Sequence, residues 1–352
     1  MSTRRRLVLA YPGDLATRTG GYLYDRRLAR ELEARGWSVD RLSLGGGFPF
    51  PSQAQLAIAE GRLAALPEGT IVLLDGLALG AMPRQAERAR ARLDLVALVH
   101  HPLCLETGLS AADAEALENS ERAALAAVRS VVVTSPRTAG ILAELMAVPE
   151  AAIAVAPPGT DHAPLAAGSS DGVLRLLSVG TVIARKAHAL LVEALSDVPG
   201  RWELTIAGSL KTDPATAERL RAAICAAGLT GRVHLAGELS SEALAGLYDR
   251  SDLFVSASLY EGYGMALAVA LARGLPIVAA AGGAVAETVP ATAGLLVPPG
   301  DRDALRTALT RCTSEPTLLA RLREGAIMAR ARLPRWPDTA ARVERALLGS
   351  GA

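Results

Sequence analysis

The residues best suited to chemistry in this sequence form one short block, in which an acid is flanked by glycine directly before an apolar segment with helical spacing. The block reads Glu261-Gly-Tyr-Gly-Met265, and the apolar segment ends at Gly274 and Pro276. A carboxylate at a helix N-terminus, beside free backbone N–H groups, can bind hydroxyls and an anion together. The glycines on either side of Tyr263 let the main chain approach a ligand closely. The block therefore predicts an anion-binding site with a group that also binds hydroxyls.

Two cations, Arg185 and Lys186, lie in a loop between a predicted strand and a helix that starts near Ala187. Cations at a helix N-terminus oppose the helix dipole, which is mildly unfavourable unless an anion lies there. A diphosphate would meet that need. A solvated pair of surface cations explains the same residues equally well at the level of sequence.

Two histidines, His100 and His101, end an apolar strand and are followed by Pro102. Two polar side chains in a row at a strand end indicate a cleft rather than a core, although such a pair is more often structural than catalytic. No acid or cysteine stands at a matching local spacing, so we expect no metal site here.

The segment around Gly20 and Gly21 opens a helix directly after the first predicted strand, where free N–H groups can bind a phosphate or a sugar hydroxyl. It lacks the GxGxxG pattern of dinucleotide sites and the acid about 20 residues later that would bind a ribose. A tight turn remains as good an explanation as a binding loop.

Length and charge limit the possible classes of protein. The chain has 352 residues, enough for two domains, with 37 basic and 36 acidic residues and a net charge of +1. We therefore expect no nucleic-acid partner.

Cys104, Cys225 and Cys312 are widely spaced, which favours core thiols in a reducing, cytoplasmic compartment. Membrane contact through Arg4–Arg6, or through a predicted arginine-rich helix that holds Arg84, Arg88, Arg90 and Arg92, is less expected than a solvated surface.

Neither a secretory signal nor a membrane span is expected from the apolar segments. The N-terminal apolar run is short, and the longest apolar region, Tyr263–Ala286, is broken by Arg273, Gly274 and Pro276.

Short apolar runs alternate with amphipathic ones in two series, which predicts two parallel sheets, each with helices on both faces. The polar stretch Ala166–Gly172 between the series is the expected linker. Predicted strands in the first series are Leu7–Tyr11, Ser38–Leu44, Ile71–Leu74, Leu95–Val99, Val131–Thr134 and Ile153–Ala156; those in the second are Leu174–Val179, Glu203–Ala207, Val233–Ala236, Leu253–Ser256, Ile277–Ala280 and Leu295–Val297. A last helix is predicted over Asp338–Leu348.

In their order along the chain, these blocks resemble the retaining glycosyltransferases of family 4, which have the GT-B fold. The resemblance implies an α/β protein with two doubly wound, Rossmann-like domains facing a cleft. It implies an acceptor-binding domain over 1–165, a donor-binding domain over 173–334 and a helix within 335–352 that returns to the first domain. The implied activity is transfer of a sugar from a nucleotide-diphosphate sugar to a small-molecule, lipid or glycan acceptor, with retention of configuration and without a metal or cofactor.

The resemblance also implies roles for individual residues. Glu261 would hold hydroxyls of the donor sugar, Lys186 and Arg185 its diphosphate, and His100 the transferred sugar. The expected substrate-binding residues are Gly20, Gly21, His101, Gly180, Glu238, Leu239, Gly262, Tyr263, Gly264, Met265 and Val269. Glu106 and Thr107 are candidates for the acceptor pocket, and Glu287 for ordering the loop Ala281–Ala284, although a solvated Glu287 is as good an explanation.

Two positions depart from the family pattern. Thr181 follows Gly180 where an arginine is commonest, so we expect Arg185 to supply the second charge. Val269 stands where a second glutamate usually grips the nucleotide ribose, and Glu193 or Glu238 are the candidates to replace it. The second departure keeps open a non-catalytic sugar- or nucleotide-binding protein. A sugar-nucleotide epimerase on the same architecture is the third reading.

Overall fold

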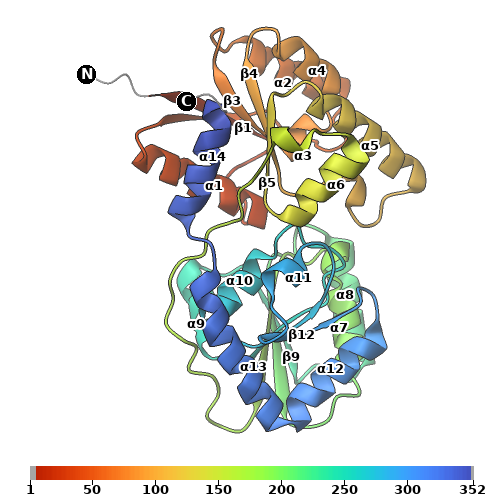
Figure 1. The fold of residues 1–352 in the computed structure, drawn as a ribbon. Helices are drawn as coiled ribbons and strands as arrows, with labels where there is room; N and C mark the ends of the chain where they lie inside the picture. Colours follow the sequence, from red (N-terminus) through yellow and green to blue (C-terminus); the bar gives the residue numbers. More distant parts are fainter. Residues whose placement is uncertain (1–4, 350–352) are drawn as a thin grey trace. The chain divides into compact units, whose positions relative to one another are not determined.

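The computed structural model describes residues 5–349, which divide into two compact units (Figure 1). Unit 1 comprises the chain up to Gly159 and from Pro334 onward, and unit 2 comprises Thr160–Leu333. Each unit has its own sheet and its own apolar core.

Unit 1 is built on a parallel sheet with the strand order β2-β1-β3-β4-β5-β6. Its central strands β3 and β4 are buried along almost their whole length, as expected for a sheet covered on both faces. The strands are β1 (Arg6–Tyr11), β2 (Ser38–Ser43), β3 (Ile71–Asp75), β4 (Asp94–Val99), β5 (Ser130–Val133) and β6 (Ile153–Val155).

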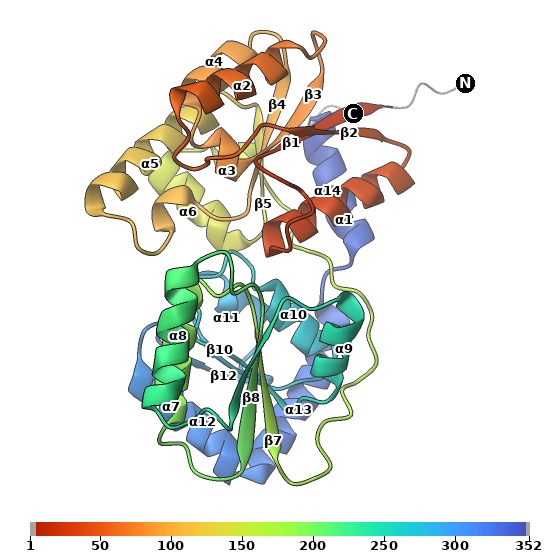
Figure 2. The same ribbon diagram turned by 180° about the vertical axis from the view of Figure 1, so that it is seen from behind.

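Helices cover both faces of this sheet. One face packs on α2 (Gln53–Ala64), α3 (Gly76–Leu79), α4 (Pro83–Ala89), α5 (Ala111–Leu125) and α6 (Pro136–Met146). On the other face, α1 (Gly20–Ala34) and α14 (Trp336–Leu348) lie side by side, as Figures 1 and 2 show. Their contact is aromatic, since the buried rings of Tyr24 and Trp336 meet edge to face with centroids 5.7 Å apart.

Unit 2 repeats the architecture with the parallel strand order β12-β11-β10-β7-β8-β9. Its strands are β7 (Leu174–Val179), β8 (Trp202–Ala207), β9 (Val233–Gly237), β10 (Leu253–Ser256), β11 (Ile277–Ala280) and β12 (Gly294–Val297). Apolar clusters on the two faces of the sheet pack against α7 (His188–Leu195), α8 (Pro214–Ala226) and α12 (Arg302–Ser314) on one side, and α9 (Ser241–Asp249), α10 (Met265–Ala272), α11 (Val285–Thr288) and α13 (Pro316–Ala329) on the other.

In each sheet, the strands are added in one direction from a central strand and then in the opposite direction. The place where the direction reverses is the topological switch point of the sheet. In unit 1 this point lies between β1 and β3, and in unit 2 between β7 and β10. Loops leave the carboxyl ends of the two strands toward opposite faces at such a point, which opens a crevice where ligands bind in doubly wound proteins. The predicted fold class is thus confirmed, and its topology singles out the loops after these four strands.

Three expectations differ in detail from the structure. The units divide between Gly159 and Thr160, whereas the stretch expected as a linker begins with the buried Ala166, whose N–H donates to the Arg273 carbonyl of unit 2 at 2.8 Å. Helix α4 ends at Ala89, so Arg90 and Arg92 lie beyond the predicted arginine-rich helix. The last helix starts at Trp336 rather than Asp338, because Pro337 fits the first turn of a helix. Arg4 lies outside the described residues.

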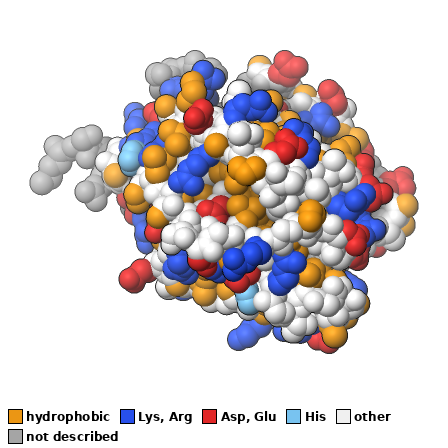
Figure 3. Space-filling view, turned by 90° about the horizontal axis from the view of Figure 1, so that it is seen from below, with side chains coloured by type: hydrophobic (Ala, Val, Ile, Leu, Met, Phe, Trp, Pro, Cys, Tyr) orange, Lys and Arg blue, Asp and Glu red, His pale blue; other side chains and the backbone are white. Residues whose placement is uncertain are grey.

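The molecular surface carries charges of both signs. On the face in Figure 3, lysine and arginine side chains are interspersed with aspartate and glutamate, in keeping with the net charge of +1. In the described part of the chain, no helix combines the length and apolar character that crossing a bilayer requires.

Candidate active site

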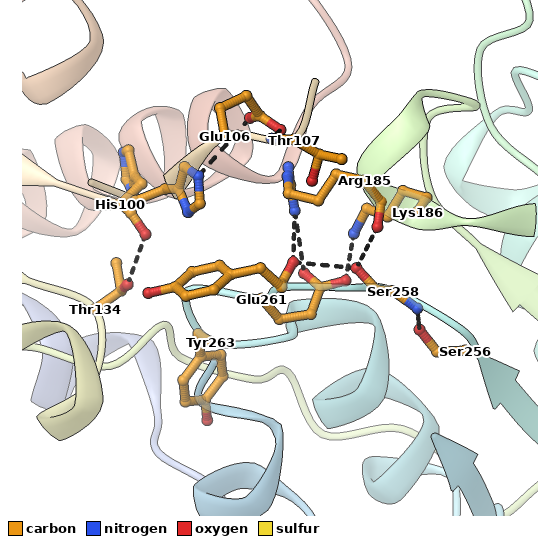
Figure 4. A network of polar contacts seen from close by, with 12 residues as sticks. His100, Glu106, Thr107, Thr134, Arg185, Lys186, Ser256, Ser258, Glu261 and Tyr263 are labelled. Carbon is orange, nitrogen blue, oxygen red and sulfur yellow. Dashed lines mark hydrogen bonds and ion pairs between the residues drawn. The ribbon is translucent and has the colours of Figure 1, made fainter. Parts of the chain in front are cut away.

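The central feature of unit 2 is an ion-pair group at its topological switch point. Lys186 and Arg185 follow β7, in a short 3-10 turn over Ala184–Lys186, and Glu261 follows β10. The Lys186 ammonium lies 2.6 Å from Glu261 Oε1, and the Arg185 guanidinium lies 4.0 Å from Glu261 Oε2 (Figure 4). Only 13–18% of each side chain is exposed. The structure therefore brings together the acid and the two cations that the sequence singled out.

Main-chain contacts hold this group in place. Arg185 NH1 donates to the Tyr260 carbonyl at 2.8 Å, while the Leu259 N–H donates to the Arg185 carbonyl at 2.8 Å. Ser258 adds hydroxyl hydrogen bonds to the carbonyls of Arg185 and Tyr260. The two loops thus brace each other, so the cations stand at fixed positions before any ligand arrives.

The loop 281–284 supports Glu261 from the other side. The Glu261 N–H donates to the Gly282 carbonyl, and the Ala284 N–H donates to the Glu261 carbonyl. A side chain cannot fit between them: a Cβ on Gly282 would lie 2.1 Å from the Leu259 carbonyl oxygen, and one on Gly283, where φ is +67°, would lie 2.2 Å from that of Glu261. These backbone contacts order the loop, and Glu287, a candidate for the same role, lies on α11 with an exposed side chain.

Electrostatics keep the group charged. Burial alone would raise the pKa of Glu261, but the cations of Lys186 and Arg185 outweigh it and hold the pKa below its usual value. Burial, with Lys186 as a second cause, lowers the pKa of His188 to about 4, so this histidine at the start of α7 is neutral. The group consequently carries two positive charges against one negative charge, an excess that suits an anion.

Two helix N-termini lie beside this excess of positive charge. No side chain of the described residues caps α7 or α10, whereas Asp213, Ser240 and Asp301 cap the helices α8, α9 and α12. An uncapped N-terminus leaves backbone N–H groups available to an outside acceptor. Helix α10 begins after Gly264 at φ +90°, a conformation that glycine adopts without strain.

The other predicted residues of unit 2 are dispersed. Gly180 lies against Lys186, since a Cβ there would be 3.1 Å from Lys186 Cε. Val269 is half-buried on α10 and packs against the apolar cluster beneath it. Glu238 and Leu239 follow the edge strand β9, two strands away from β7, and Glu193 is exposed on α7.

Unit 1 also has a polar group at its switch point. Gly20 and Gly21 open α1, which Thr19 caps by accepting a hydrogen bond from the Tyr22 N–H at 3.3 Å. Gly21 lies under the His100 ring, because a Cβ there would be 3.3 Å from His100 Cδ2. His100 itself follows β4, and Thr134 donates to its carbonyl at 3.4 Å.

The neighbouring histidine has a different partner. His101 Nε2 lies 3.8 Å from a carboxylate oxygen of Glu106, and a second oxygen of Glu106 accepts from the Thr107 N–H at 3.0 Å. These contacts place His101 with the loop expected to line an acceptor pocket.

Sequence reasoning did not assign the two acids that surround His100. Asp25 Oδ1 lies 2.9 Å from His100 Nε2, and Asp75 ends β3 beside them. No acid stands at a matching local spacing near His100 in the sequence, but two acids that are distant in the sequence lie beside it in the structure. One signal was present: Asp25 stands on the same helix stripe as Leu28, Ala29 and Leu32, all buried, so an acid there interrupts an apolar face.

Comparison with known proteins finds similarity to one family over part of the chain and to single proteins over more of it. Residues 166–328 match the family model of glycosyl transferases group 1. The MMP alpha-(1→4)-mannosyltransferase of Mycolicibacterium hassiacum is 29% identical over 84% of this chain and 74% of its own length. The lipopolysaccharide core biosynthesis mannosyltransferase LpcC of Rhizobium leguminosarum bv. viciae is 28% identical over 62% of this chain and 65% of its own length.

Solved structures agree on the fold. Sucrose-phosphate synthase from Thermosynechococcus elongatus superposes with a TM-score of 0.82 at 24% identity, covering 97% of this chain and 98% of its own. Anabaena HepE, in complex with UDP and glucose, gives a TM-score of 0.75 at 16% identity, with 96% and 98% covered. The fold is therefore GT-B, and within it residues 166–328 are similar to the glycosyl transferases group 1.

Proposed function

We propose that the chain is a retaining glycosyltransferase, which moves a sugar from a nucleotide-diphosphate sugar to an acceptor hydroxyl without a metal ion. A nucleotide-sugar donor is supported by structures of the same fold, among them HepE with bound UDP-glucose. Retention rests on the resemblance to family 4. The acceptor is a small molecule, a lipid or a glycan, and the three cysteines, which are free thiols, fit a reducing, cytoplasmic setting.

The observation that carries the proposal is the group formed by Arg185, Lys186 and Glu261 in unit 2. In glycosyl transfer the bond between sugar and phosphate breaks, and negative charge grows on the leaving diphosphate. Two braced cations and the uncapped N-terminus of α10 can stabilise that charge without reorganising, which is usually the largest contribution to catalysis. Because these groups supply positive charge where the diphosphate departs, the proposal needs no metal.

Glu261 has a second task in this scheme. Held as a carboxylate by Lys186, it accepts hydrogen bonds from donor-sugar hydroxyls and so orients the ring. His100 contacts the transferred sugar. The leaving phosphate receives the proton of the acceptor hydroxyl on the same face from which it departs, so that configuration is retained without a protein nucleophile.

The test removes the charges one at a time. Lys186→Ala and Glu261→Ala should each lower kcat by about 10²–10³-fold in an assay of sugar transfer and donor hydrolysis with a panel of nucleotide sugars, as loss of a preorganised transition-state contact does. Lys186→Ala should also weaken binding of the nucleoside diphosphate product in calorimetry.

Matched controls come from the same unit. Glu218 and Arg221 pair with each other on α8 at 3.2 Å with highly exposed side chains, so Glu218→Ala and Arg221→Ala should leave both rate and binding unchanged. Near-wild-type rates for Lys186→Ala and Glu261→Ala would refute the site.

A second candidate function follows from Val269, since valine cannot accept a hydrogen bond from a ribose. Binding of nucleotide sugars without turnover would favour a non-catalytic binding protein. Interconversion of donor sugars in the absence of any acceptor would favour an epimerase.

A further inference from the structure

A cluster of two acids and a histidine occupies the switch point of unit 1. Asp25 comes from the second turn of α1, Asp75 from the end of β3 and His100 from the end of β4. One donor atom from each lies within 4.8 Å of the others. The Asp25 side chain is fully buried and Asp75 is 4% exposed. The fold therefore shields two carboxyl groups from water side by side, an arrangement that needs compensation.

Asp25 is only half satisfied by His100. Its Oδ1 lies 2.9 Å from His100 Nε2, but its Oδ2 has no hydrogen-bond partner among the described residues and no access to water. A buried carboxylate oxygen without a donor is rare in folded proteins, so its missing partner needs to be identified. The nearest acidic neighbour, Asp75, is the candidate.

Asp75 is oriented by its own backbone contact. Its Oδ1 accepts from the Leu77 N–H at 2.7 Å and so caps the short helix α3. Burial, followed by the charge of Asp25, raises the pKa of Asp75 to about 7. Two carboxyl groups this close in a buried site cannot both ionise, so one of them keeps a proton.

The histidine is held on its other sides as well. The Tyr24 ring meets the His100 ring edge to face, with centroids 5.1 Å apart and an angle of 77°, and Gly21 lies beneath it. Burial lowers the pKa of His100, but Asp25 and then Asp75 raise it further than burial lowers it. Tyr22 and Tyr24 of α1 also face the cluster, and burial raises the pKa of both phenols, so they stay neutral.

We propose that Asp25 is a positioning residue that fixes His100 through the ring Nε2–H, and that Asp75 completes the arrangement as a protonated carboxyl group that donates to Asp25 Oδ2. Every buried oxygen of Asp25 is then satisfied. An imidazolium, one carboxylate and one neutral carboxyl group sum to zero charge, so the cluster needs no further ion. The part that His100 plays in sugar transfer rests on the proposed function, but the geometry of the three side chains does not.

A divalent cation is the competing occupant, because two carboxylates and an imidazole are also ligands for metals such as Zn²⁺ or Mn²⁺. A metal would require His100 to bind through an unprotonated Nε2. The two explanations therefore predict opposite protonation states of the same nitrogen atom.

Nitrogen-15 NMR of the histidine rings in the full chain distinguishes them. Asparagine substitution of His100 identifies its signals among the five histidines. In the wild-type chain, Nε2 of His100 should stay protonated from pH 6 to pH 9, because the hydrogen bond to Asp25 fixes the tautomer. A ring protonated only at Nδ1 would overturn the proposal, and this measurement needs no altered acid.

Two substitutions separate the roles of the acids. Asp25→Asn removes the partner charge and should lower the pKa of His100 by about one unit or more. Asp75→Asn places an amide where the protonated carboxyl group stands, keeps a donor toward Asp25, and should change the pKa of His100 much less. Asp40→Asn, which removes only an exposed ion pair with Arg6, is the control and should leave the pKa unchanged.

The remaining outcomes are equally decisive. Equal effects of Asp25→Asn and Asp75→Asn on the pKa of His100, or selective broadening of the His100 signals by added Mn²⁺, would overturn the proposal. In the transfer assay, Asp25→Asn should lower kcat with little change in KM. If the charge substitutions in unit 2 disprove the transferase, the NMR results still decide the cluster.

Discussion

At the scale of single residues, two acids lie on helix faces that are otherwise apolar, and their different surroundings favour different protonation states. Asp25 of α1 has a histidine partner and an acidic neighbour. Glu121 of α5 aligns with the buried Leu117, Ala124 and Leu125, and its Oε2 accepts from the Leu103 N–H at 2.8 Å. A buried acid with one neutral donor should keep its proton, whereas one beside a cation-forming group can ionise.

Glu121 yields a prediction about stability. Burial raises its pKa to about 8 from an ordinary value of 4.5, even though the Leu103 N–H acts in the opposite direction. Between these two pH values the folded chain retains a proton that the unfolded chain has lost, so stability falls as pH rises through this window, by up to about 1.4 kcal/mol per pH unit. Glu121→Gln keeps an acceptor for Leu103 without titrating. Its melting temperature relative to wild type should therefore rise from pH 5 to about pH 8 and level off above that pH.

The control for this prediction is Glu115→Gln, an exposed glutamate on the same helix, whose melting curve should run parallel to that of wild type. A constant difference between Glu121→Gln and wild type across the pH range would show that Glu121 is ionised throughout.

At the scale of elements, the switch points decide which residues meet. Lys186 and Glu261 are 75 positions apart, as are Asp25 and His100, and in both cases the strand order brings the members together. The strands themselves follow from apolar runs: β7, β10 and β11 have the predicted ends. The order of the strands within a sheet is harder to predict, because it depends on which strands pair across the whole sheet. The local sequence pattern therefore predicted the individual strands well, but it did not predict that Asp25 pairs with His100.

Helix α10 carries the prediction for Val269. The Val269 side chain lies one turn into this helix, whose N-terminus is uncapped. Because the side chain is only half-buried, a longer polar side chain at this position can reach solvent. Val269→Glu should tighten binding of a nucleoside diphosphate by about 10–100-fold, the effect of one hydrogen bond to a charged group. Calorimetry checks this.

Two comparisons make the Val269 result specific to the ribose. Inorganic pyrophosphate has no ribose and should bind Val269→Glu and wild type equally, and Val269→Leu should not tighten either ligand. Unchanged affinity of Val269→Glu for the nucleoside diphosphate would place the ribose elsewhere on unit 2.

At the scale of the whole molecule, two units of the same architecture carry different chemistry at equivalent places in the fold. The switch point of unit 2 gathers two cations around one acid, and that of unit 1 gathers two acids around one histidine. The near-zero net charge conceals this contrast, which is why overall composition led us to expect no nucleic-acid partner but did not indicate a ligand. The family resemblance indicated the class of ligand, and the ion-pair geometry shows which side chains stand ready together.

The central claim is that the braced pair of Arg185 and Lys186, with the N-terminus of α10, binds a diphosphate. A crystal structure of the chain with UDP, GDP or ADP tests it most directly. We predict that the diphosphate oxygens accept hydrogen bonds from the Lys186 ammonium and from backbone N–H groups at the start of α10. A diphosphate bound in full occupancy away from both would contradict the account.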